Sequence, residues 1–508
     1  MTHMSKISKL MVACAATALL APAAAGGEHV VILSTNDTHS QIDPASDGLG
    51  GILRRRAVFD QVRRDNKHVV AVDAGDDVQG TLYFSLYGGK VEFACLDSLH
   101  YDMTIMGNHE LDNGADSLAF LYNKMLTPRL STNYDMSASR MAGHFEPYIV
   151  KAFGDKRMAF IGLNVNPKGM ISEGNYNGIR YLDPYDVADA TAKYLKEVQK
   201  VDFVTVVSHI GYDSYEASQP NDSTLVTRSH YIDLVIGGHS HTLLRPGDKR
   251  TQVANADGRI ITIGQNSKSG KYVGRYDVDL DTRKVEYSQI KIDSSLDAAA
   301  ARYTAMQAWL APYRHGVDSL MNTPVVTSAR RMASQSQAAQ NWLSDAAASI
   351  VRGLSGRHID FAVMNKGGIR QDFPQGDMSE GLIGSMFPFN NRFMVLEITG
   401  ADLLEGLKVM AGRGGDAVSR ELRVTYDAAG NVTSAKVNGK KVDPRKVYSM
   451  ATIDYLANGG DYMVPFTRAK RVYVDGVPYG RHMIAYMRQL AAQGKKVEAT
   501  GEMRMQKK

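Results

Sequence analysis

The chain has 508 residues, of which 44% are hydrophobic and 22% are charged, and its formal net charge is +5. These values are ordinary for a globular protein, so they argue against a disordered chain and against a strongly basic binding surface. The longest basic run is Arg54-Arg55-Arg56, and no nucleic-acid-binding motif follows it. We therefore expect no nucleic acid polymer as a partner.

Residues 1–25 have the pattern of a secretory signal peptide. Lys6 and Lys9 form a basic start, Leu10–Leu20 is apolar, and Ala23-Ala24-Ala25 is a small-residue cleavage site. This pattern predicts an exported protein, periplasmic or secreted, with no transmembrane segment in the mature chain. A cell-surface lipoprotein acylated at Cys14 is the alternative, but most of the apolar stretch follows Cys14 rather than preceding it.

Five short apolar runs each end in residues that commonly bind metals. They are Val30–Leu33 before Asn36-Asp37-Thr38-His39, Val69–Val72 before Asp73-Ala74-Gly75-Asp76, Thr104–Met106 before Gly107-Asn108-His109-Glu110-Leu111-Asp112, Val204–Val207 before Ser208-His209, and Leu234–Ile236 before Gly237-Gly238-His239-Ser240-His241. Such runs are typical of buried strands, and ligands collect at the carboxyl ends of parallel strands. Any one block can arise by chance, but five in succession predict a dinuclear metal site and a hydrolase acting on phosphorus.

The residue types indicate how the metals would be held. Imidazole and carboxylate suit zinc, manganese or similar ions, so we expect two divalent metal ions. Two ions about 3.5–4 Å apart need an anionic bridge, for which Asp76 is suited, and they can share a hydroxide that attacks phosphorus in line. Asn108 can supply a neutral oxygen. The histidines would divide between the two ions as His39 with His241, and His209 with His239.

His109 and Asp112 are expected to act together. They lie three residues apart where a helix is expected to begin, so they share a face. Asp112 can orient and polarise His109, which can then stabilise a phosphoryl transition state or protonate the leaving oxygen. A purely supporting role for His109 is the alternative.

Residues 28–296 alternate strand-like and helix-like segments. Helices are predicted over Gly51–Arg64 and Asp186–Lys200, and an antiparallel pair over Tyr272–Leu280 and Lys284–Ile292. This alternation predicts an α/β domain with a largely parallel core.

A connecting helix is predicted in residues 297–323. Asp297 could cap it, apolar residues recur every three or four positions as far as Met321, and Pro312 should kink it. Residues 324–505 then form a second domain of mixed α and β type, with a helix over Gln337–Gly353 and a strand over Ile359–Met364.

The five metal-type blocks resemble, in order, those of calcineurin-like metallophosphoesterases, and the variant with Asn-Asp-x-His and Gly-Asn-His-Glu-x-Asp resembles the 5′-nucleotidase family. The resemblance implies a four-layer β-sandwich flanked by helices, then a connecting helix and a second, α+β nucleotide-binding domain. It implies that one metal is held by Asp37, His39, Asp76 and His241, and the other by Asp76, Asn108, His209 and His239. It also implies that His109 and Asp112 form the catalytic dyad.

The second domain carries three further blocks of that family. They are Asn365, Gly367, Gly368 and Arg370 of Asn-x-Gly-Gly-Ile-Arg, then Pro388, Phe389 and Asn391 of Pro-Phe-x-Asn, and Tyr455 to Asp461 of aromatic-Leu-Ala-Asn-Gly-Gly-Asp. By resemblance, Phe389 and Tyr455 would stack on the base, Asp461 would bind the ribose, and Arg370 and Asn365 would contact phosphate or sugar. Core packing of the two aromatic rings is the alternative. The chain departs from the family at Asn390, where glycine is usual, and at Tyr455, where phenylalanine is common.

Together these patterns predict an enzyme of nucleotide catabolism that hydrolyses nucleoside 5′-phosphates to nucleoside and phosphate. One alternative is the same chemistry on UDP-sugars, dinucleotides or 2′,3′-cyclic nucleotides. A second is a thiosulfohydrolase-like reaction, and a third is a non-catalytic nucleotide-binding protein. The sequence indicates no oligomeric state.

Overall fold

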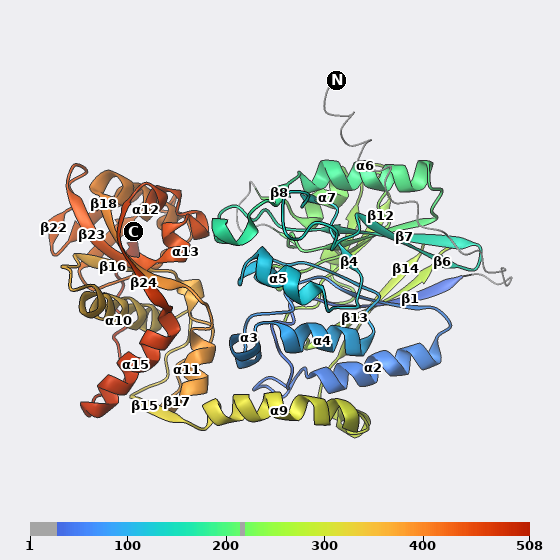
Figure 1. Cartoon of the computed structure of the whole chain (residues 1–508). Coiled ribbons are helices and arrows are strands. Elements are labelled where there is room, and N and C mark those ends of the chain that lie inside the picture. The colour runs from blue at the N-terminus through green and yellow to red at the C-terminus, as the bar shows by residue number, and fades with distance from the viewer. Residues whose placement is uncertain (1–27, 214–218) are drawn as a thin grey trace.

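Two six-stranded sheets pack face to face in the N-terminal part of the chain (Figure 1). We analysed a computed structural model that describes residues 28–213 and 219–508, so the expected signal peptide lies outside the described residues. The first sheet has the order β14-β13-β1-β2-β3-β4, with β1 (His29–Thr35), β2 (Val69–Asp73), β3 (Met103–Ile105), β4 (Arg129–Leu130), β13 (Tyr272–Asp279) and β14 (Val285–Lys291). The second has the order β11-β12-β10-β9-β7-β6, with β6 (Tyr148–Phe153), β7 (Lys156–Leu163), β9 (Phe203–Ser208), β10 (Leu234–Ile236), β11 (Gln252–Ala254) and β12 (Ile260–Gly264).

Each sheet has a parallel core, with antiparallel strands at one edge of the first sheet and at both edges of the second. Strands β1 to β4 run parallel, as do β7, β9, β10 and β12, while β13, β14, β6 and β11 pair antiparallel. The five apolar runs of the sequence form β1, β2, β3, β9 and β10. Because the carboxyl ends of parallel strands meet at one edge, the polar blocks that follow these strands are brought together.

Alternate residues of each central strand face different cores. In β1, Val30 and Ile32 pack between the two sheets, whereas Val31 and Leu33 face the helices that cover the first sheet. Those helices are α2 (Ile52–Asp65), α3 (Leu82–Tyr87), α4 (Lys90–Leu99) and α5 (Ala115–Tyr122). The outer face of the second sheet is covered by α6 (Pro184–Glu197) and α7 (Asp222–Arg228). The expected four layers are therefore present.

The connector differs from the single helix that the sequence predicts. It consists of α8 (Asp297–Ala300) and α9 (Thr304–Met321), which are separated by residues 301–303. The Asp297 carboxylate accepts a hydrogen bond from Arg54 Nε (2.6 Å) instead of capping a long helix. Helix α9 continues through Pro312 and is fixed to the first domain, because Arg314 binds Asp43 (2.7 Å) and Tyr87 Oη donates to the carbonyl of Tyr313 (3.0 Å).

The second domain is built on a five-stranded sheet with helices packed against it. The sheet has the order β19-β16-β23-β18-β24, with β16 (Phe361–Met364), β18 (Arg392–Thr399), β19 (Ala417–Val418), β23 (Val447–Ile453) and β24 (Lys470–Pro478). A smaller sheet contains β20 (Leu422–Tyr426), β21 (Val432–Val437), β22 (Lys440–Lys441) and β25 (Met505–Lys507), and β15 (Pro324–Ser328) pairs with β17 (Gly376–Ser379). The main helices are α10 (Gln337–Ser355), α11 (Glu380–Met386), α12 (Gly400–Gly412) and α15 (Tyr479–Ala492).

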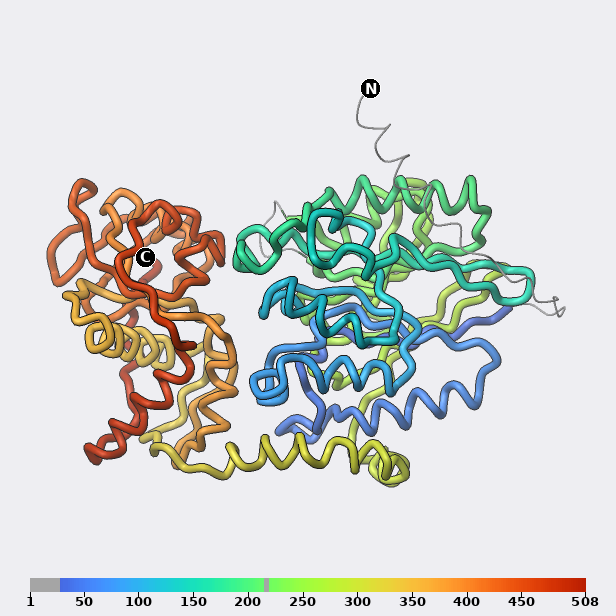
Figure 2. Tube along the Cα trace, viewed as in Figure 1, coloured from blue at the N-terminus to red at the C-terminus, as the bar shows by residue number. Residues whose placement is uncertain are grey.

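The two domains lie side by side, with α9 running from one to the other (Figure 2). Helix α11 of the second domain contacts both α9 and α3. Nearer the strand ends of the first domain, Asn390 Nδ2 donates to Asn113 Oδ1 (2.8 Å). Among the residues described, no helix is both long and apolar enough to span a membrane.

The last strand of the chain is tied to α10 by a partly buried carboxylate, which gives a stability prediction. Asp345 binds both Arg504 (2.8 Å) and Arg420 (2.9 Å), and the Arg504 side chain is only 4% exposed. Burial raises the pKa of Asp345, but the two guanidinium groups outweigh this effect and hold the pKa below its ordinary value. This stabilisation is therefore present above the unfolded-state pKa and is lost as the pH falls through the lower folded-state pKa.

We expect Asp345→Asn to lower the free energy of unfolding by about 2 kcal/mol at pH 7, because a partly buried charge-assisted pair is lost. Urea denaturation at pH 7 and at acid pH measures this difference, which should shrink at acid pH. Glu286→Gln is the control, since Glu286 forms an exposed pair with Lys284. Equal losses for both variants at pH 7 would contradict the assigned role of Asp345.

Candidate functional site

The strand-end loops gather the residues that the sequence predicts as metal ligands. Three overlapping groups each have candidate ligand atoms within 4.8 Å of one another: Asp37, His39 and His241; His39, Asp76 and His109; and Asp76, His209 and His239. Asn108 joins the cluster because its Oδ1 lies 2.9 Å from Nδ1 of His239. Asp76 belongs to two of the groups, which is the position that a bridging ligand must occupy.

Much of this cluster has an unusual backbone conformation. Five of the predicted ligands, none of them glycine, have a positive φ in the left-handed region: Asp37 (50°), His39 (47°), Asp76 (57°), His239 (74°) and His241 (54°). For a non-glycine residue this conformation costs about 1–2 kcal/mol. Such strain is characteristic of functional sites, where the surrounding structure holds the side chains in place.

Two glycines allow the loops of β2 and β3 to approach each other. A Cβ atom at Gly107 would lie 2.2 Å from Asp76 Oδ1, and one at Gly75 would lie 2.4 Å from the backbone nitrogen of Gly107. Any side chain at either position would therefore displace the Asp76 carboxylate or its loop.

Backbone carbonyls set the orientation of two histidines. His209 Nδ1 lies 2.6 Å from the carbonyl of Ala74, and His39 Nδ1 lies 3.2 Å from the carbonyl of Gln79. A carbonyl oxygen only accepts hydrogen bonds, so each Nδ1 carries a proton, and in the neutral imidazole each Nε2 would present its lone pair to a metal.

The chemistry of these donors fits divalent cations. His209 Nε2 is buried, lies 3.2 Å from Asp76 Oδ2 and makes no well-formed hydrogen bond with the described residues. His39 Nε2 and His241 Nε2 are only 2.8 Å apart. Convergent imidazole lone pairs and carboxylate oxygens are the donors that zinc, manganese and similar ions prefer.

The charges in the cluster depend on one another. Burial alone would raise the pKa of Asp76, but His209, His109 and His39 outweigh burial and hold that pKa well below its usual range. Conversely, burial disfavours charge on His209, yet Asp76 and Asp37 raise the pKa of His209 to about 10. Burial lowers the pKa of His239 to about 4, assisted by the charge of His209. The cluster therefore concentrates negative charge on its two aspartates.

Glu110, the glutamate of the Gly-Asn-His-Glu-Leu-Asp block, has a structural role. Its carboxylate accepts hydrogen bonds from the backbone N–H groups of Gly107 (2.6 Å), Asp77 (2.8 Å) and Asp76 (3.1 Å). This carboxylate therefore joins the loop after β3 to the loop after β2. Burial, and the nearby charges of Asp76 and Asp77, raise the pKa of Glu110 to about 8.

His109 and Asp112 contact each other as the spacing predicts. They lie at the ends of a single 3₁₀ turn, η1 (His109–Leu111), and His109 Nδ1 is 2.9 Å from Asp112 Oδ2. Burial lowers the pKa of His109, but Asp112 and Asp76 outweigh it and raise the pKa above its ordinary value. Asn175 fixes the turn by donating to the backbone carbonyl of Asp112 (2.9 Å).

The second domain presents Arg370 and Phe389 to this dyad. The Phe389 ring lies 6.2 Å from the His109 ring, measured between centroids, and Arg370 Cζ lies 5.8 Å from the Phe389 centroid. Burial lowers the pKa of Arg370, against the opposing charges of Asp76 and Asp112. Its guanidinium group therefore faces the metal-type cluster across the domain boundary.

The other predicted nucleotide residues occupy two turns and the start of β18. Asn365, Gly367 and Gly368 form the turn that precedes Arg370, and Asn365 Oδ1 is buried without a hydrogen bond to any described residue. Asn391 lies just before β18, and its carbonyl accepts the N–H of Tyr479 (2.8 Å). Tyr455 and Asp461 bind each other, with Tyr455 Oη 2.9 Å from Asp461 Oδ1.

Two cations in this region were not singled out from the sequence. Lys268 lies in the loop after β12, a sixth apolar run with a polar end, so the rule that found the other loops could have found it. Burial lowers the pKa of Lys268, and so does the charge of Arg370. The N–H of the next residue, Ser269, donates to the carbonyl of Asp37 (2.7 Å), so this loop lies beside the cluster. Arg413, at the end of α12, donates to the backbone carbonyl of Asp461. No local pattern marks Arg413.

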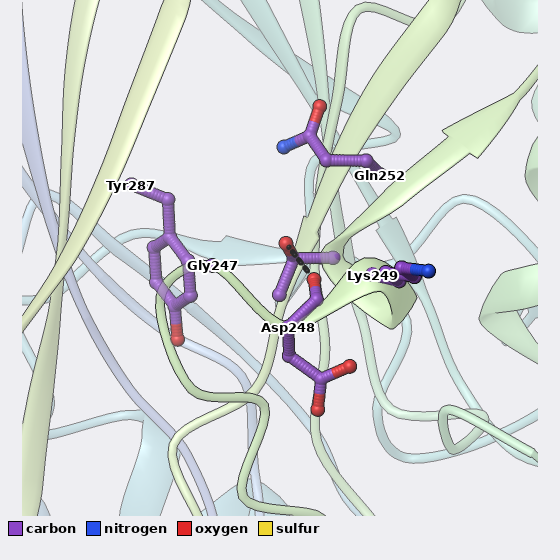
Figure 3. A pocket seen from close by; sticks show the side chains of 6 residues that line it. Gly247, Asp248, Lys249, Gln252 and Tyr287 are labelled. Atoms are coloured by element: carbon purple, nitrogen blue, oxygen red, sulfur yellow. Dashed lines mark hydrogen bonds between the residues drawn. The ribbon is translucent and has the colours of Figure 1, made fainter.

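A narrow cavity of about 40 Å³ lies beside His239, with walls from both domains. Tyr462 lines it from the second domain, and Asn166, Met170 and Ile210 are among the residues that line it from the first. Figure 3 shows a larger cavity, of about 390 Å³, lined by Gly247, Asp248, Lys249, Thr251, Gln252 and Tyr287. None of its lining residues belongs to the metal-type cluster.

Comparison with known proteins agrees with this geometry. Residues 30–243 match the family described as calcineurin-like phosphoesterase, and residues 319–468 match the C-terminal domain of 5′-nucleotidases. The chain belongs to the 5′-nucleotidase family of calcineurin-like phosphoesterases. The resemblance and the fold class expected from the sequence are thus confirmed, and the chain is a hydrolase of phosphate esters in a family that uses divalent metals.

Individual relatives match over most of this chain. Human 5′-nucleotidase is 25% identical over 86% of this chain and 84% of its own length. A trifunctional nucleotide phosphoesterase of Bacillus subtilis is 26% identical over 87% of this chain, but this chain spans only 32% of that protein. The crystal structure of a 5′-nucleotidase precursor from Thermus thermophilus is 27% identical, with a TM-score of 0.81, and the match covers 94% of this chain and 99% of that one.

Metal binding by the cluster can be tested without any substrate. We expect His209→Ala to weaken binding of Zn²⁺ or Mn²⁺ at least about 100-fold, because a buried imidazole donor is removed. Mass spectrometric metal analysis after gel filtration, and the shift in melting temperature on adding metal, measure the effect. His230→Ala is the control, because His230 is an exposed histidine paired with Asp257. Equal metal content in the wild type and His209→Ala would contradict the assignment.

Proposed function

We propose that this protein removes phosphate from nucleoside 5′-phosphates, with the first domain holding the phosphate and the second domain holding the nucleoside. The observation that carries the proposal is the contact between the two sites. Phe389 and Arg370 of the second domain face the His109–Asp112 pair and the aspartates of the cluster. A ligand bound between these groups would have an anion-binding end and an aromatic end, as a nucleotide requires.

Asp37, His39, Asp76 and His241 would hold one divalent ion, and Asp76, Asn108, His209 and His239 a second. Such ions supply neutralisation of phosphate charge and activation of water at neutral pH. The protein contributes fixed donor atoms, since hydrogen bonds to backbone carbonyls orient His39 and His209 and strained loops hold the aspartates.

His109 would act on the phosphate or on the leaving oxygen. Its Nδ1 proton is directed at Asp112 Oδ2, so Nε2 is the atom free to donate a hydrogen bond or a proton to the substrate. Asp112 is itself held by Asn175, which keeps the imidazole in one orientation. The pair thus presents a positioned donor beside the cluster.

Arg370 and Lys268 would bind the phosphate from opposite domains. The charge of Arg370 lowers the pKa of Lys268, and a phosphate bound near both cations would offset this repulsion. Phe389 and Tyr455 would contact the base, Asp461 the ribose, and the turn of Asn365, Gly367 and Gly368, with Asn391, would complete the nucleoside site. The glycines allow close approach of the backbone.

Export to the periplasm or the medium, and a role in nucleotide catabolism, belong to this proposal. Export is supported by the pattern of residues 1–25.

The reaction is tested with a substrate panel. We expect the chain lacking residues 1–25, supplied with Mn²⁺ or Zn²⁺, to release phosphate from AMP or UMP, and EDTA to abolish the release. His109→Ala should lower kcat about 10²–10⁴-fold, because a positioned acid–base group is lost. His315→Ala, an exposed histidine of α9, is the control.

Other outcomes of this panel would indicate a different substrate class. Turnover confined to UDP-glucose, a dinucleotide, a 2′,3′-cyclic nucleotide or bis(p-nitrophenyl) phosphate would replace the monoester proposal. No turnover with metal bound would favour a thiosulfohydrolase-like reaction or a non-catalytic binding protein.

The phosphate-binding role of Lys268 has its own test. We expect Lys268→Met to raise KM for the nucleotide, and the inhibition constant of inorganic phosphate, by about threefold to tenfold, because a charge-assisted hydrogen bond is lost. Inhibition by the nucleoside product should not change. Lys249→Met is the control, because Lys249 lies in the separate cavity of Figure 3. A variant that binds phosphate as the wild type does would remove Lys268 from the site.

A further inference from the structure

The turn that carries Asp461 is strained and is held from several sides. It joins α13 (Asp454–Ala457) to α14 (Val464–Thr467) through Asn458-Gly459-Gly460-Asp461-Tyr462-Met463. Asp461 and Tyr462 have φ values of 53° and 60°, in the left-handed region that non-glycine residues rarely adopt. Such a conformation persists only where neighbouring contacts hold it.

Tyr455 supplies two of these contacts through one hydroxyl group. Its O–H lies 2.9 Å from Asp461 Oδ1, and its oxygen accepts the backbone N–H of Asp461 at 3.1 Å. Arg413 supplies a third contact by donating to the Asp461 carbonyl, while its Nη1 lies 3.7 Å from Oδ2. Arg413 is in turn fixed by Asp416 (2.6 Å).

The Tyr455 ring cannot easily move away from this position. It packs directly on Gly460, where an added Cβ atom would lie only 2.5–2.6 Å from three atoms of the ring. The hydroxyl is therefore held over the Asp461 carboxylate by the backbone below it. Phenylalanine, the residue common here in the family, has no hydroxyl and would leave both carboxylate oxygens available.

This arrangement limits what the carboxylate can accept. A ribose offers two neighbouring hydroxyl groups, and a carboxylate with two available oxygens can accept one hydrogen bond on each. Here one lone pair of Oδ1 already accepts from Tyr455, which weakens Oδ1 as an acceptor and leaves Oδ2 as the stronger acceptor for the sugar.

We infer that Asp461 accepts a hydrogen bond from only one of the two ribose hydroxyl groups, and that Tyr455 is the positioning residue that imposes this selectivity. The inference rests on the proposed function, because it assumes that a nucleoside occupies the second domain. Its consequence is that the enzyme tolerates the loss of one particular hydroxyl group, at either the 2′ or the 3′ position, but not of the other.

The wild-type enzyme provides the first test. We expect kcat/KM for one of 2′-deoxy-AMP and 3′-deoxy-AMP to stay within about threefold of the value for AMP. The other should fall at least about tenfold, which corresponds to one lost charge-assisted hydrogen bond. Similar losses for both analogues, or no loss for either, would overturn the inference.

Tyr455→Phe provides the second test. Removing the hydroxyl frees Oδ1, so the analogue that the wild type tolerates should now fall about fivefold or more relative to AMP. Tyr473→Phe is the matched control, because Tyr473 also donates to an aspartate, Asp475 Oδ1 (2.7 Å), but on β24. An unchanged ratio in a folded Tyr455→Phe variant would overturn the role of the hydroxyl. If that variant does not fold, the wild-type comparison decides.

Equilibrium binding separates this inference from the proposed function. Calorimetry with adenosine, 2′-deoxyadenosine and 3′-deoxyadenosine on the EDTA-treated wild-type protein needs no catalysis. Weaker binding of one deoxynucleoside alone supports the inference. Equal weakening of both contradicts the inference while leaving nucleoside binding intact. No binding of any nucleoside would overturn the proposed function and the inference with it.

Discussion

The concentration of imidazole and carboxylate groups in one buried volume is the constraint on which the first domain depends. Asp37 and Asp76 are almost fully buried, and their negative charge would be costly there without nearby positive charge. His209 supplies part of it, since Asp76 and Asp37 raise its pKa to about 10 after burial has lowered it. A bound cation would supply more. The left-handed loops follow from the same need, because they turn the side chains inward from several strands.

Several residues outside the cluster hold its loops, and the second domain, in place. Glu110 ties the backbone of the β3 loop to that of the β2 loop, and Gly75 and Gly107 let the two loops touch. Helix α9 is fixed to the first domain by Arg314, so the second domain starts from a defined point on the first. The fold therefore separates two tasks: the strained loops hold charge, and the second domain holds Phe389 and Arg370 over it.

How much of this the sequence could predict depends on the range of each interaction. Apolar runs with polar ends identified β1, β2, β3, β9 and β10, because a short apolar stretch of sequence is enough to indicate a buried strand. The break between α8 and α9 is not evident from the sequence, because the contacts beside it, Asp297 with Arg54 and Tyr303 with Asp60, join residues distant in the chain. Arg413 was missed for the same reason, since only the folded chain brings it to Asp461. The loop of Lys268 follows a sixth apolar run, β12, so the local pattern that identifies the other loops applies to it as well.

The two departures from the family pattern have the same physical effect. Asn390, where glycine is usual, donates to Asn113, the residue that follows Asp112, and so joins the second domain to the loop of the dyad. Tyr455, where phenylalanine is common, binds Asp461 and fixes a strained turn. Each adds a hydrogen bond that restrains a group before any ligand binds, which lowers the ordering entropy lost on binding. The same restraint removes donors and acceptors that a ligand could otherwise use, so pre-organisation here is gained at the expense of contacts to the sugar.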